Sequence, residues 1–453
     1  MTSLAHNPAA GATTSRHPGL EPVPSGPRTV VSAAIARRLF TAAIRRLDVL
    51  VEEAPNRRGI GRTFGLGGPR MVINRPEEFY ARVGRDGLIG FGEAYLTGAW
   101  DTEDLAEFLT VPAARIATLI PESLQRARTL VTHRTPRHQR STEANSQANI
   151  AHHYDLSNEL FALFLDDTLS YSSALFPTSF DAGPEGPDHL IATPPEGTDN
   201  AADSAGVVHS PDFAEAQARK IERLLDEAGV TDGSRVLEIG TGWGELAIRA
   251  ARRGASVHSI TLSVEQLELA EQRVADAGCT DLVRIELLDY RALAQPEFAA
   301  AYDAIVSVEM IEAVGHEFWG TYFQTLDHAL APGGRIAIQA ITMPHDRMLA
   351  TQGTQTWINK YIFPGGFLPS VQVIDEITSE QTALRRTGIL EFGSHYAETL
   401  RRWDKRFLAQ RDAVIALGFD DQFMRMWHFY LEYSRAGFAS GYINVQQLTF
   451  VKE

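Results

Sequence analysis

The sequence predicts an α/β protein with a mostly parallel sheet, helices on both faces of that sheet, and a smaller α+β domain before it. Its 453 residues are enough for two or three domains. From Phe213 onward, helical and strand-like segments alternate, which is typical of a parallel sheet. Residues 58–110 instead combine a glycine-rich turn, a short strand and a helix, which indicates a separate α+β unit.

The N-terminal part begins with residues 1–30, which are rich in Pro, Gly, Ser and Thr and are predicted to form a disordered tail. From Val31 to Val51, apolar residues recur at helical spacing, with arginines in the gaps. These arginines are Arg37, Arg38, Arg45 and Arg46. Such a basic amphipathic helix either docks on its own domain or lies on a membrane surface. With a strand at Met71–Ile73 and a helix at Pro76–Val83, this domain is predicted over residues 31–130.

The larger domain is predicted over residues 131–453. Residues 181–210 contain almost no large apolar side chain and are predicted to be a disordered insertion. The expected elements are, in order, helix 213–228, strand 235–239, helix 245–253, strand 256–261, helix 263–277, strands 283–288 and 302–308, helix 319–330 and strand 334–341.

Composition excludes several classes of protein. The single cysteine, Cys279, excludes a disulfide framework, a cysteine-rich zinc site and an iron–sulfur cluster. No apolar run approaches the roughly 18 residues of a spanning helix, and the N-terminus lacks the apolar core of a secretory signal, so we expect a cytoplasmic protein. Residues 1–150 carry a net charge of +5 and the remainder −20. This asymmetry fits either a domain that meets an anionic surface or a lightly charged solvated one.

The most informative motif is Val236-Leu237-Glu238-Ile239-Gly240-Thr241-Gly242-Trp243-Gly244. A buried strand ends in three alternate glycines and then a helix starts. Glycine lets the backbone approach a bound nucleoside, and the helix N-terminus offers free N–H groups, although a plain tight turn would also use glycine. Glu238 can accept hydrogen bonds from the backbone or a ligand.

Further acidic and aromatic residues follow later strands. Asp289 and Tyr290 end the third strand, where an Asp could bind an adenine amino group and a Tyr could stack on the ring. Glu309 and Glu312 follow the next strand. Because ligands of open α/β sheets bind at the carboxyl ends of strands, these residues should lie together. The arrangement resembles the Rossmann-like S-adenosylmethionine (SAM)-dependent methyltransferases.

Longer motifs narrow this resemblance to the cyclopropane-fatty-acid synthase family. They are His153–Phe161, Leu169–Ser173, Thr261–Gln266 and Trp357–Gly366, and Leu88–Trp100 resembles that family's smaller N-terminal domain. The family transfers the SAM methyl group to the cis double bond of an acyl chain in a membrane phospholipid. Within it, Leu237–Glu245 and Val308–Val314 look most like the actinobacterial branch that methylenates oleoyl chains at carbon 10, the first step to tuberculostearic acid.

The resemblance implies which residues hold SAM, and no metal site is expected. The implied SAM-binding residues are Tyr171, Ser172, Glu238, Gly240, Thr241, Gly242, Gly244, Thr261, Leu262, Gln266, Asp289 and Tyr290. Gln266 would take the ribose role that an acidic residue plays elsewhere. The aromatic C-terminal third could line an acyl tunnel and stabilise a cation.

The catalytic positions depart from the family pattern. The family holds a bicarbonate that takes the proton released after methyl transfer, with a Cys, a Glu, a His and a Tyr among its ligands. Here the matching residues are Ser173, Glu312, Gln339 and Tyr396, and Glu309 stands where glycine is usual. Gln cannot carry a charge, so bicarbonate binding is doubtful. We expect a protein carboxylate to act instead: Glu312 first, then Glu309 or Glu143.

We therefore expect a SAM-dependent C-methyltransferase that forms a 10-methylene chain on a phospholipid. The alternatives are a cyclopropane product, because the position of the base selects the product, and a non-catalytic SAM- or lipid-binding module. The expected partners are an anionic membrane surface at the inner face of the cell membrane, a reductase for the methylene product and a second copy of the chain. Nucleic acid is not expected, since the catalytic part is acidic.

Overall fold

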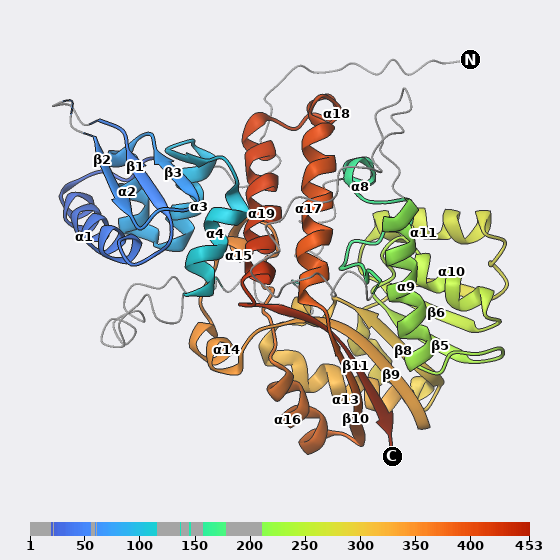
Figure 1. Ribbon diagram of the computed structural model, residues 1–453. Coiled ribbons are helices and arrows are strands. Elements are labelled where there is room, and N and C mark those ends of the chain that lie inside the picture. The colour runs from blue at the N-terminus through green and yellow to red at the C-terminus, as the bar shows by residue number, and fades with distance from the viewer. Residues whose placement is uncertain are drawn as a thin grey trace, which may run out of the picture.

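The computed structural model describes residues 22–55, 61–115, 157–177 and 211–453, together with Leu20, Gly59, Pro136 and Asn145. Most of the predicted tail, the segment with Glu143 and the predicted insertion 181–210 lie outside the described residues. The described chain forms a small N-terminal domain and a larger α/β domain that pack against each other (Figure 1). Among the described helices, none combines the length and apolar character needed to cross a membrane.

The N-terminal domain is α+β, as predicted. Its four-stranded sheet has the order β2-β1-β3-β4, in which β1 and β3 are parallel and the outer pairs antiparallel. Its elements are α1 (Pro27–Ile44), β1 (Leu50–Glu53), β2 (Arg62–Gly65), β3 (Arg70–Ile73), α2 (Pro76–Asp86), α3 (Leu88–Leu96), β4 (Trp100–Thr102) and α4 (Leu105–Ala114).

The bounds predicted for the first helix, Val31–Val51, are wrong at both ends. It starts at Pro27, which is well suited to a first helical turn because its missing N–H would have no partner there. It ends at Ile44, and the last residues of the predicted helix form β1 instead. Val51 in β1 is fully buried and pairs with Phe64 on one side and Met71 on the other. Burial between two strands therefore outweighs the helical spacing of the apolar residues.

The larger domain holds a seven-stranded sheet of order β10-β11-β9-β8-β5-β6-β7. The five strands from β9 to β7 are parallel, and β10 and β11 are antiparallel. Its strands are β5 (Arg235–Ile239), β6 (Ser256–Thr261), β7 (Val283–Leu287), β8 (Tyr302–Val308), β9 (Leu330–Thr342), β10 (Leu384–Glu391) and β11 (Asn444–Lys452). The sequence predicted the first five of these.

Helices cover both faces of this sheet, as predicted. Val236 and Val306 pack with α9 and α10 on one face, whereas Leu237 and Ile305 pack with α13 and α16 on the other. Successive strand residues point to opposite faces, which is why two separate cores form. The helices are α9 (Pro211–Glu227), α10 (Glu245–Arg252), α11 (Val264–Asp276), α12 (Ile311–Val314), α13 (Trp319–Ala329), α14 (His345–Thr351), α15 (Trp357–Tyr361) and α16 (Val371–Gln381), with short 3-10 turns at Tyr290–Ala294, Pro296–Phe298 and His316–Phe318.

A second helical layer stands beyond the sheet. It comprises α8 (Asn158–Phe164), α17 (Gly393–Ala409), α18 (Arg411–Ala416) and α19 (Asp421–Ala439). Figure 1 shows α17 and α19 side by side, with the N-terminal domain against α19. Aromatic side chains fill the space between these helices: Trp403 stacks on Tyr171 at 5.2 Å, and Trp427 stacks on Phe423 at 5.6 Å. This layer closes the end of the sheet at which the site lies.

The two domains meet at a buried carboxylate, Glu93 on α3. Its Oε1 accepts hydrogen bonds from Lys360 Nζ at 2.6 Å and Tyr361 Oη at 2.9 Å, both on α15. Its Oε2 accepts a hydrogen bond from Arg82 Nη1 at 3.3 Å, on its own domain. Since Glu93 is fully buried, its negative charge is compensated by cations from both domains.

We expect Glu93→Gln to lower the free energy of unfolding by about 3 kcal/mol, because it leaves buried cations without their anion. Denaturant unfolding of the whole chain measures this loss. Glu77→Gln removes a negative charge from an exposed position of α2 and should change the free energy by less than about 0.5 kcal/mol. Equal stability of the two variants would contradict the role given to Glu93.

Candidate active site

The glycine-rich turn after β5 has the backbone geometry that its sequence predicts. Gly240, Gly242 and Gly244 have φ angles of 96°, 52° and 87°, which glycine adopts readily. The backbone N–H groups of Gly240 and Thr241 donate to Ile260 O and so fix the turn on β6. A Cβ atom on Gly242 would meet no atom within 4 Å. The turn therefore has room on one side for a bound group.

A chain of buried polar groups connects the turn to β5 and β6. Glu238 accepts a hydrogen bond from the Ser259 hydroxyl, and Ser259 Oγ lies 2.7 Å from Thr241 Oγ1. Burial raises the pKa of Glu238 to about 8. The hydrogen bond from Ser259 of β6 therefore fixes the orientation of the Glu238 carboxyl group.

The next wall of the site is formed by the segments after β6 and β7. Thr261 Oγ1 donates to Gln266 Oε1 at 2.9 Å. Asp289 accepts from the backbone N–H of Arg291 at 2.9 Å and from its guanidinium at 2.7 Å. The Tyr290 hydroxyl is buried, and the Arg291 guanidinium lies 4.9 Å from the centre of the Tyr290 ring.

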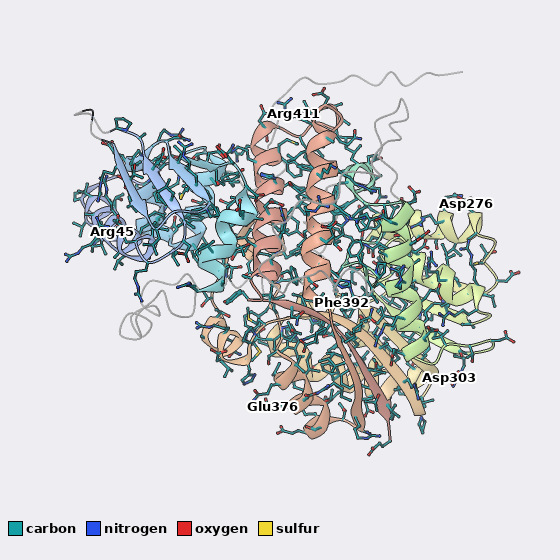
Figure 2. The ribbon with its side chains drawn as sticks, viewed as in Figure 1. Arg45, Asp276, Asp303, Glu376, Phe392 and Arg411 are labelled. Atoms are coloured by element: carbon teal, nitrogen blue, oxygen red, sulfur yellow. The ribbon has the colours of Figure 1, made fainter. Side chains whose placement is uncertain are left out.

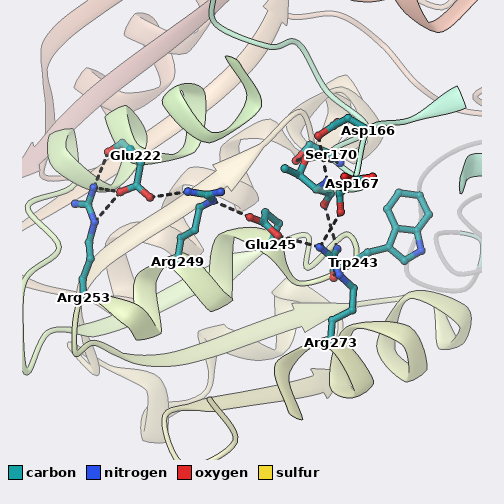
Figure 3. Close-up of polar contacts among 10 residues, drawn as sticks. Asp166, Asp167, Ser170, Glu222, Trp243, Glu245, Arg249, Arg253 and Arg273 are labelled. Carbon is teal, nitrogen blue, oxygen red and sulfur yellow. Dashed lines mark hydrogen bonds and ion pairs between the residues drawn. The ribbon is translucent and has the colours of Figure 1, made fainter. Parts of the chain in front are cut away.

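The segment that carries Tyr171 and Ser172 is bound to the glycine turn by Arg273 of α11. The Arg273 guanidinium donates to the carbonyl oxygens of Thr168 and Trp243, at 3.0 and 2.9 Å, and pairs with Glu245 at 2.9 Å. Figure 3 shows Arg273 between this segment and the start of α10. Arg273, which was not predicted from the sequence, therefore joins two predicted parts of the SAM site.

Glu309 lies at the centre of the predicted catalytic residues. Its Oε1 accepts hydrogen bonds from the Ser173 backbone N–H at 2.9 Å and from Gln339 Nε2 at 2.8 Å. Its Oε2 accepts one from the Tyr396 hydroxyl at 2.6 Å. Three segments far apart in the sequence thus donate to one carboxylate, which follows β8 directly.

The backbone and the environment of Glu309 are both unusual. Its φ angle is 49°, a left-handed conformation that costs a non-glycine residue energy and often marks a functional position. Burial raises its pKa above the usual range, while the Tyr396, Ser173 and Gln339 hydrogen bonds and the charge of Lys220 lower it. Burial and the Glu309 charge raise the pKa of Tyr396 well above its usual range, so Tyr396 stays protonated and donates.

Glu312 has a different environment. Its Oε1 accepts a hydrogen bond from the Ile341 backbone N–H, and its Oε2 is buried without a hydrogen-bond partner among the described residues. Burial, together with the negative charge of Glu309, raises the pKa of Glu312 to about 8. At neutral pH, Glu312 is therefore mostly protonated.

Comparison with known proteins identifies the family. Residues 141–448 match the family described as mycolic acid cyclopropane synthetase. The chain belongs to this family. Its larger domain is the SAM-binding domain of a methyltransferase, and the predicted Rossmann-like α/β fold is confirmed.

Relatives of the family match over different lengths. The tuberculostearic acid methyltransferase UfaA1 of Mycobacterium tuberculosis is 48% identical over 98% of this chain and 97% of its own length. The cyclopropane-fatty-acyl-phospholipid synthase of Escherichia coli K12 is 31% identical over 84% of this chain and 88% of its own. The crystal structure of the mycolic acid cyclopropane synthase CmaA1, complexed with SAH and CTAB, has a TM-score of 0.54 at 28% identity, covering 70% of this chain and 99% of that one. S-adenosylhomocysteine in that relative supports the prediction of SAM as the methyl donor.

Within this family fold, most predicted site residues lie on the segments that border the glycine turn or Glu309. Ser173, Gln339 and Tyr396 all bind Glu309. Leu262, half-buried, follows β6 beside Thr261. Glu143 lies outside the described residues. Lys220 on α9 and Gln447 on β11 are buried polar residues that, like Arg273, were not predicted from the sequence.

Proposed function

We propose that the protein transfers the methyl group of SAM to the double bond of an oleoyl chain in a membrane phospholipid and forms a 10-methylene chain. The 48% identity to a tuberculostearic acid methyltransferase over nearly the whole chain supports this reaction. In the structure, the proposal rests on the environment of Glu309: its carboxylate is buried and accepts three hydrogen bonds. This carboxylate supports a base at the position where the departures from the family pattern cluster.

The chemistry divides between the donor and the chain's own residues. SAM supplies an electrophilic methyl group: as the alkene attacks, the new C–C bond forms, the C–S bond breaks and a cation remains on the acyl chain. A hydride then moves from the branch carbon to its neighbour, which leaves the cation on the branch carbon. Glu309 accepts a proton from the new methyl group, and the C–H electron pair becomes the C=C bond of the methylene branch. Without the hydride shift, loss of that proton closes a cyclopropane.

Glu309 suits the role of base better than Glu312 or bicarbonate. The hydrogen bonds from Tyr396, Ser173 and Gln339 and the charge of Lys220 favour the ionised form of Glu309, which is the form that accepts a proton. Tyr396, Gln339 and the Ser173 N–H hold it in one orientation. These donors would otherwise be free to bind an anion such as bicarbonate, but here they bind a side chain. Glu312, ranked first from the sequence, would support Glu309 from the adjacent helix α12.

Chain analysis of the product tests this proposal. The protein is incubated with SAM and a dioleoyl phospholipid, and the acyl chains are analysed by mass spectrometry before and after mild hydrogenation. A methylene branch becomes a methyl branch and gains two hydrogens, whereas the isomeric cyclopropane does not under those conditions. A cyclopropane product, or SAM binding without turnover, would overturn the proposal.

The N-terminal domain provides the surface for the membrane in this proposal. Val31, Ile35 and Leu39 lie four residues apart on α1, and their side chains are 61%, 56% and 49% exposed. Arg38, Arg45 and Arg46 are exposed too, and Figure 2 shows Arg45 at the outer edge of the domain. The helix and the two arginines that follow it therefore present apolar and basic side chains together, which favours an anionic lipid surface.

One of the predicted lipid-facing arginines has another role. The Arg37 guanidinium pairs with Glu53 and lies 5.3 Å from the centre of the Tyr80 ring. It therefore fixes α1 to the sheet of its domain. In this proposal, the protein works at the inner face of the cell membrane, as a dimer, and hands its methylene product to a reductase.

We expect the double variant Arg45→Glu/Arg46→Glu to bind anionic vesicles about 30-fold more weakly, at roughly 1 kcal/mol per lost basic residue. Vesicle sedimentation at low and high salt measures this binding, which should weaken as salt screens the charges. The control Arg252→Glu/Arg284→Glu makes the same change of charge on exposed positions of the larger domain. Equal loss in both double variants would show a net-charge effect and contradict docking through α1.

A further inference from the structure

Lys220 is a buried cation that the proposed reaction leaves without a role. It lies on α9 and is 1% exposed. Its Nζ donates a hydrogen bond to Ser172 Oγ at 2.6 Å, and it forms no ion pair with any residue that the structure describes. Burying an ammonium group without a paired carboxylate is costly, and burial lowers the pKa of Lys220 to about 8. A nearby negative charge would offset the free-energy cost of burying this ammonium group.

The compensating charge is Glu309. Lys220 binds Ser172, and the next residue, Ser173, binds Glu309 through its backbone N–H. A second connection runs through Gln447, whose Nε2 donates to Lys220 O at 3.2 Å and to Gln339 Oε1 at 3.1 Å. Gln339 in turn donates to Glu309. Two consecutive residues of one segment, Ser172 and Ser173, therefore contact the Lys220 ammonium and the Glu309 carboxylate, and Gln447 links Gln339 to the backbone of Lys220.

The charged and titratable groups around this pair come from several elements. Glu309 faces Tyr396 of α17, Glu312 of α12 and Lys220 of α9. Lys220 also experiences the charges of Asp166, after α8, and Glu245, at the start of α10. Burial opposes the ionisation of Glu309, and Lys220 is the cation that favours it.

We propose that Lys220 is a positioning residue that keeps Glu309 ionised at neutral pH and so ready to accept the proton. This inference rests on the proposed function of Glu309 as the base. Glu309 accepts a proton only in its charged form, which exists above its pKa. A neighbouring cation lowers that pKa, and removal of the cation raises it. Without Lys220, the rate of methyl transfer should therefore fall at neutral pH and recover as the pH rises.

The test is the pH profile of a single turnover in Lys220→Met, with dioleoyl phospholipid vesicles and SAM between pH 6 and 9.5. We expect the acidic limb of the profile to move up by about one pH unit or more, the usual effect of an opposite charge nearby. The rate at pH 7 should then be lower than in the wild type, by at most about tenfold for each unit of the shift. At the alkaline end of this range the two profiles should converge, because Glu309 is ionised in both proteins there.

Gln217 offers a matched control on the same helix. Its Nε2 donates to the carbonyl oxygens of Ser170 and Ser172, so it supports the same segment without a charge. Gln217→Leu should change the KM for SAM or the rate by one factor at every pH and leave the profile in place. Lys220→Met should instead move the acidic limb of the profile to higher pH. If Lys220→Met fails to fold, Lys220→Gln is measured in its place.

An infrared titration gives a readout that does not need turnover. The protonated-carboxyl band that disappears in Glu309→Gln reports Glu309 in the chain without SAM. Its midpoint should rise by about one pH unit or more in Lys220→Met. An unmoved midpoint, or a rate loss that is equal at all pH values, overturns the role of Lys220 even if the wild type forms the methylene product. A wild type that forms no methylene product instead overturns the proposed function itself.

Discussion

Replacing Glu309 by Gln should lower the rate of methyl transfer about 10²–10⁴-fold, the usual scale for the loss of a general base. The amide keeps the size of the side chain and can still accept from Ser173 or Tyr396, but it cannot take a proton. Single-turnover measurements with saturating SAM and dioleoyl phospholipid give the rate. SAM affinity, measured by calorimetry, should stay close to that of the wild type.

Two other glutamates serve as comparisons. Glu312→Gln should cost much less, because Glu312 binds the Ile341 N–H and its raised pKa keeps it mostly protonated at neutral pH. Glu143→Gln tests the remaining candidate from the sequence. Adding or stripping bicarbonate should change the wild-type rate little. If Glu309→Gln keeps a near wild-type rate, or if activity collapses only when bicarbonate is removed, Glu309 is not the base and a cyclopropane product becomes the better interpretation.

Gly242→Val should weaken SAM binding about 100-fold or more. A side chain there projects into the open side of the glycine turn, where the nucleoside is expected, and a clash of about 3 kcal/mol corresponds to that factor. Calorimetry with S-adenosylhomocysteine measures the affinity. An affinity within a few-fold of the wild type would contradict the assignment of this turn.

Backbone strain needs its own control, because valine disfavours a φ of 52° wherever it occurs. Gly278 has a φ of 68°, and a Cβ atom there would also meet no atom within 4 Å, but it follows α11, away from the turn. Gly278→Val should therefore lose a similar amount of stability and keep its SAM affinity. Thermal unfolding of both variants separates strain from the loss of the ligand site.

The sequence predicted the parallel strands well because their apolar residues form short buried runs between helices. β5, β6 and β8 have the predicted bounds. β10 and β11 were missed: β10 is the edge strand, and β11, from the end of the chain, lies antiparallel between β10 and β9. Their pairing depends on contacts between distant segments, which local patterns do not encode.

The candidate site was predicted as a set of residues but not as a geometry. Ser173, Glu309, Gln339 and Tyr396 were all named from the family resemblance, yet the sequence ranked Glu312 above Glu309. The distinction depends on which carboxylate receives the donors, and those donors lie in three separate segments. Lys220 was missed because a lysine on an amphipathic helix is usually solvated, and only the packed structure shows it buried.

The position of β11 has a consequence for the order in which the protein matures. This strand inserts between β9 and β10, and its Gln447 completes the hydrogen bonds of Gln339. The ribosome must therefore pass residue 447 before Gln339, which binds the proposed base Glu309, has all its hydrogen bonds, long after the glycine turn at residues 240–244 has emerged. A nascent chain would then complete the proposed nucleoside site before the proposed proton acceptor is in place. Assembly of the catalytic centre would then be the last event of folding, delayed by the slow closure of a long-range strand pairing.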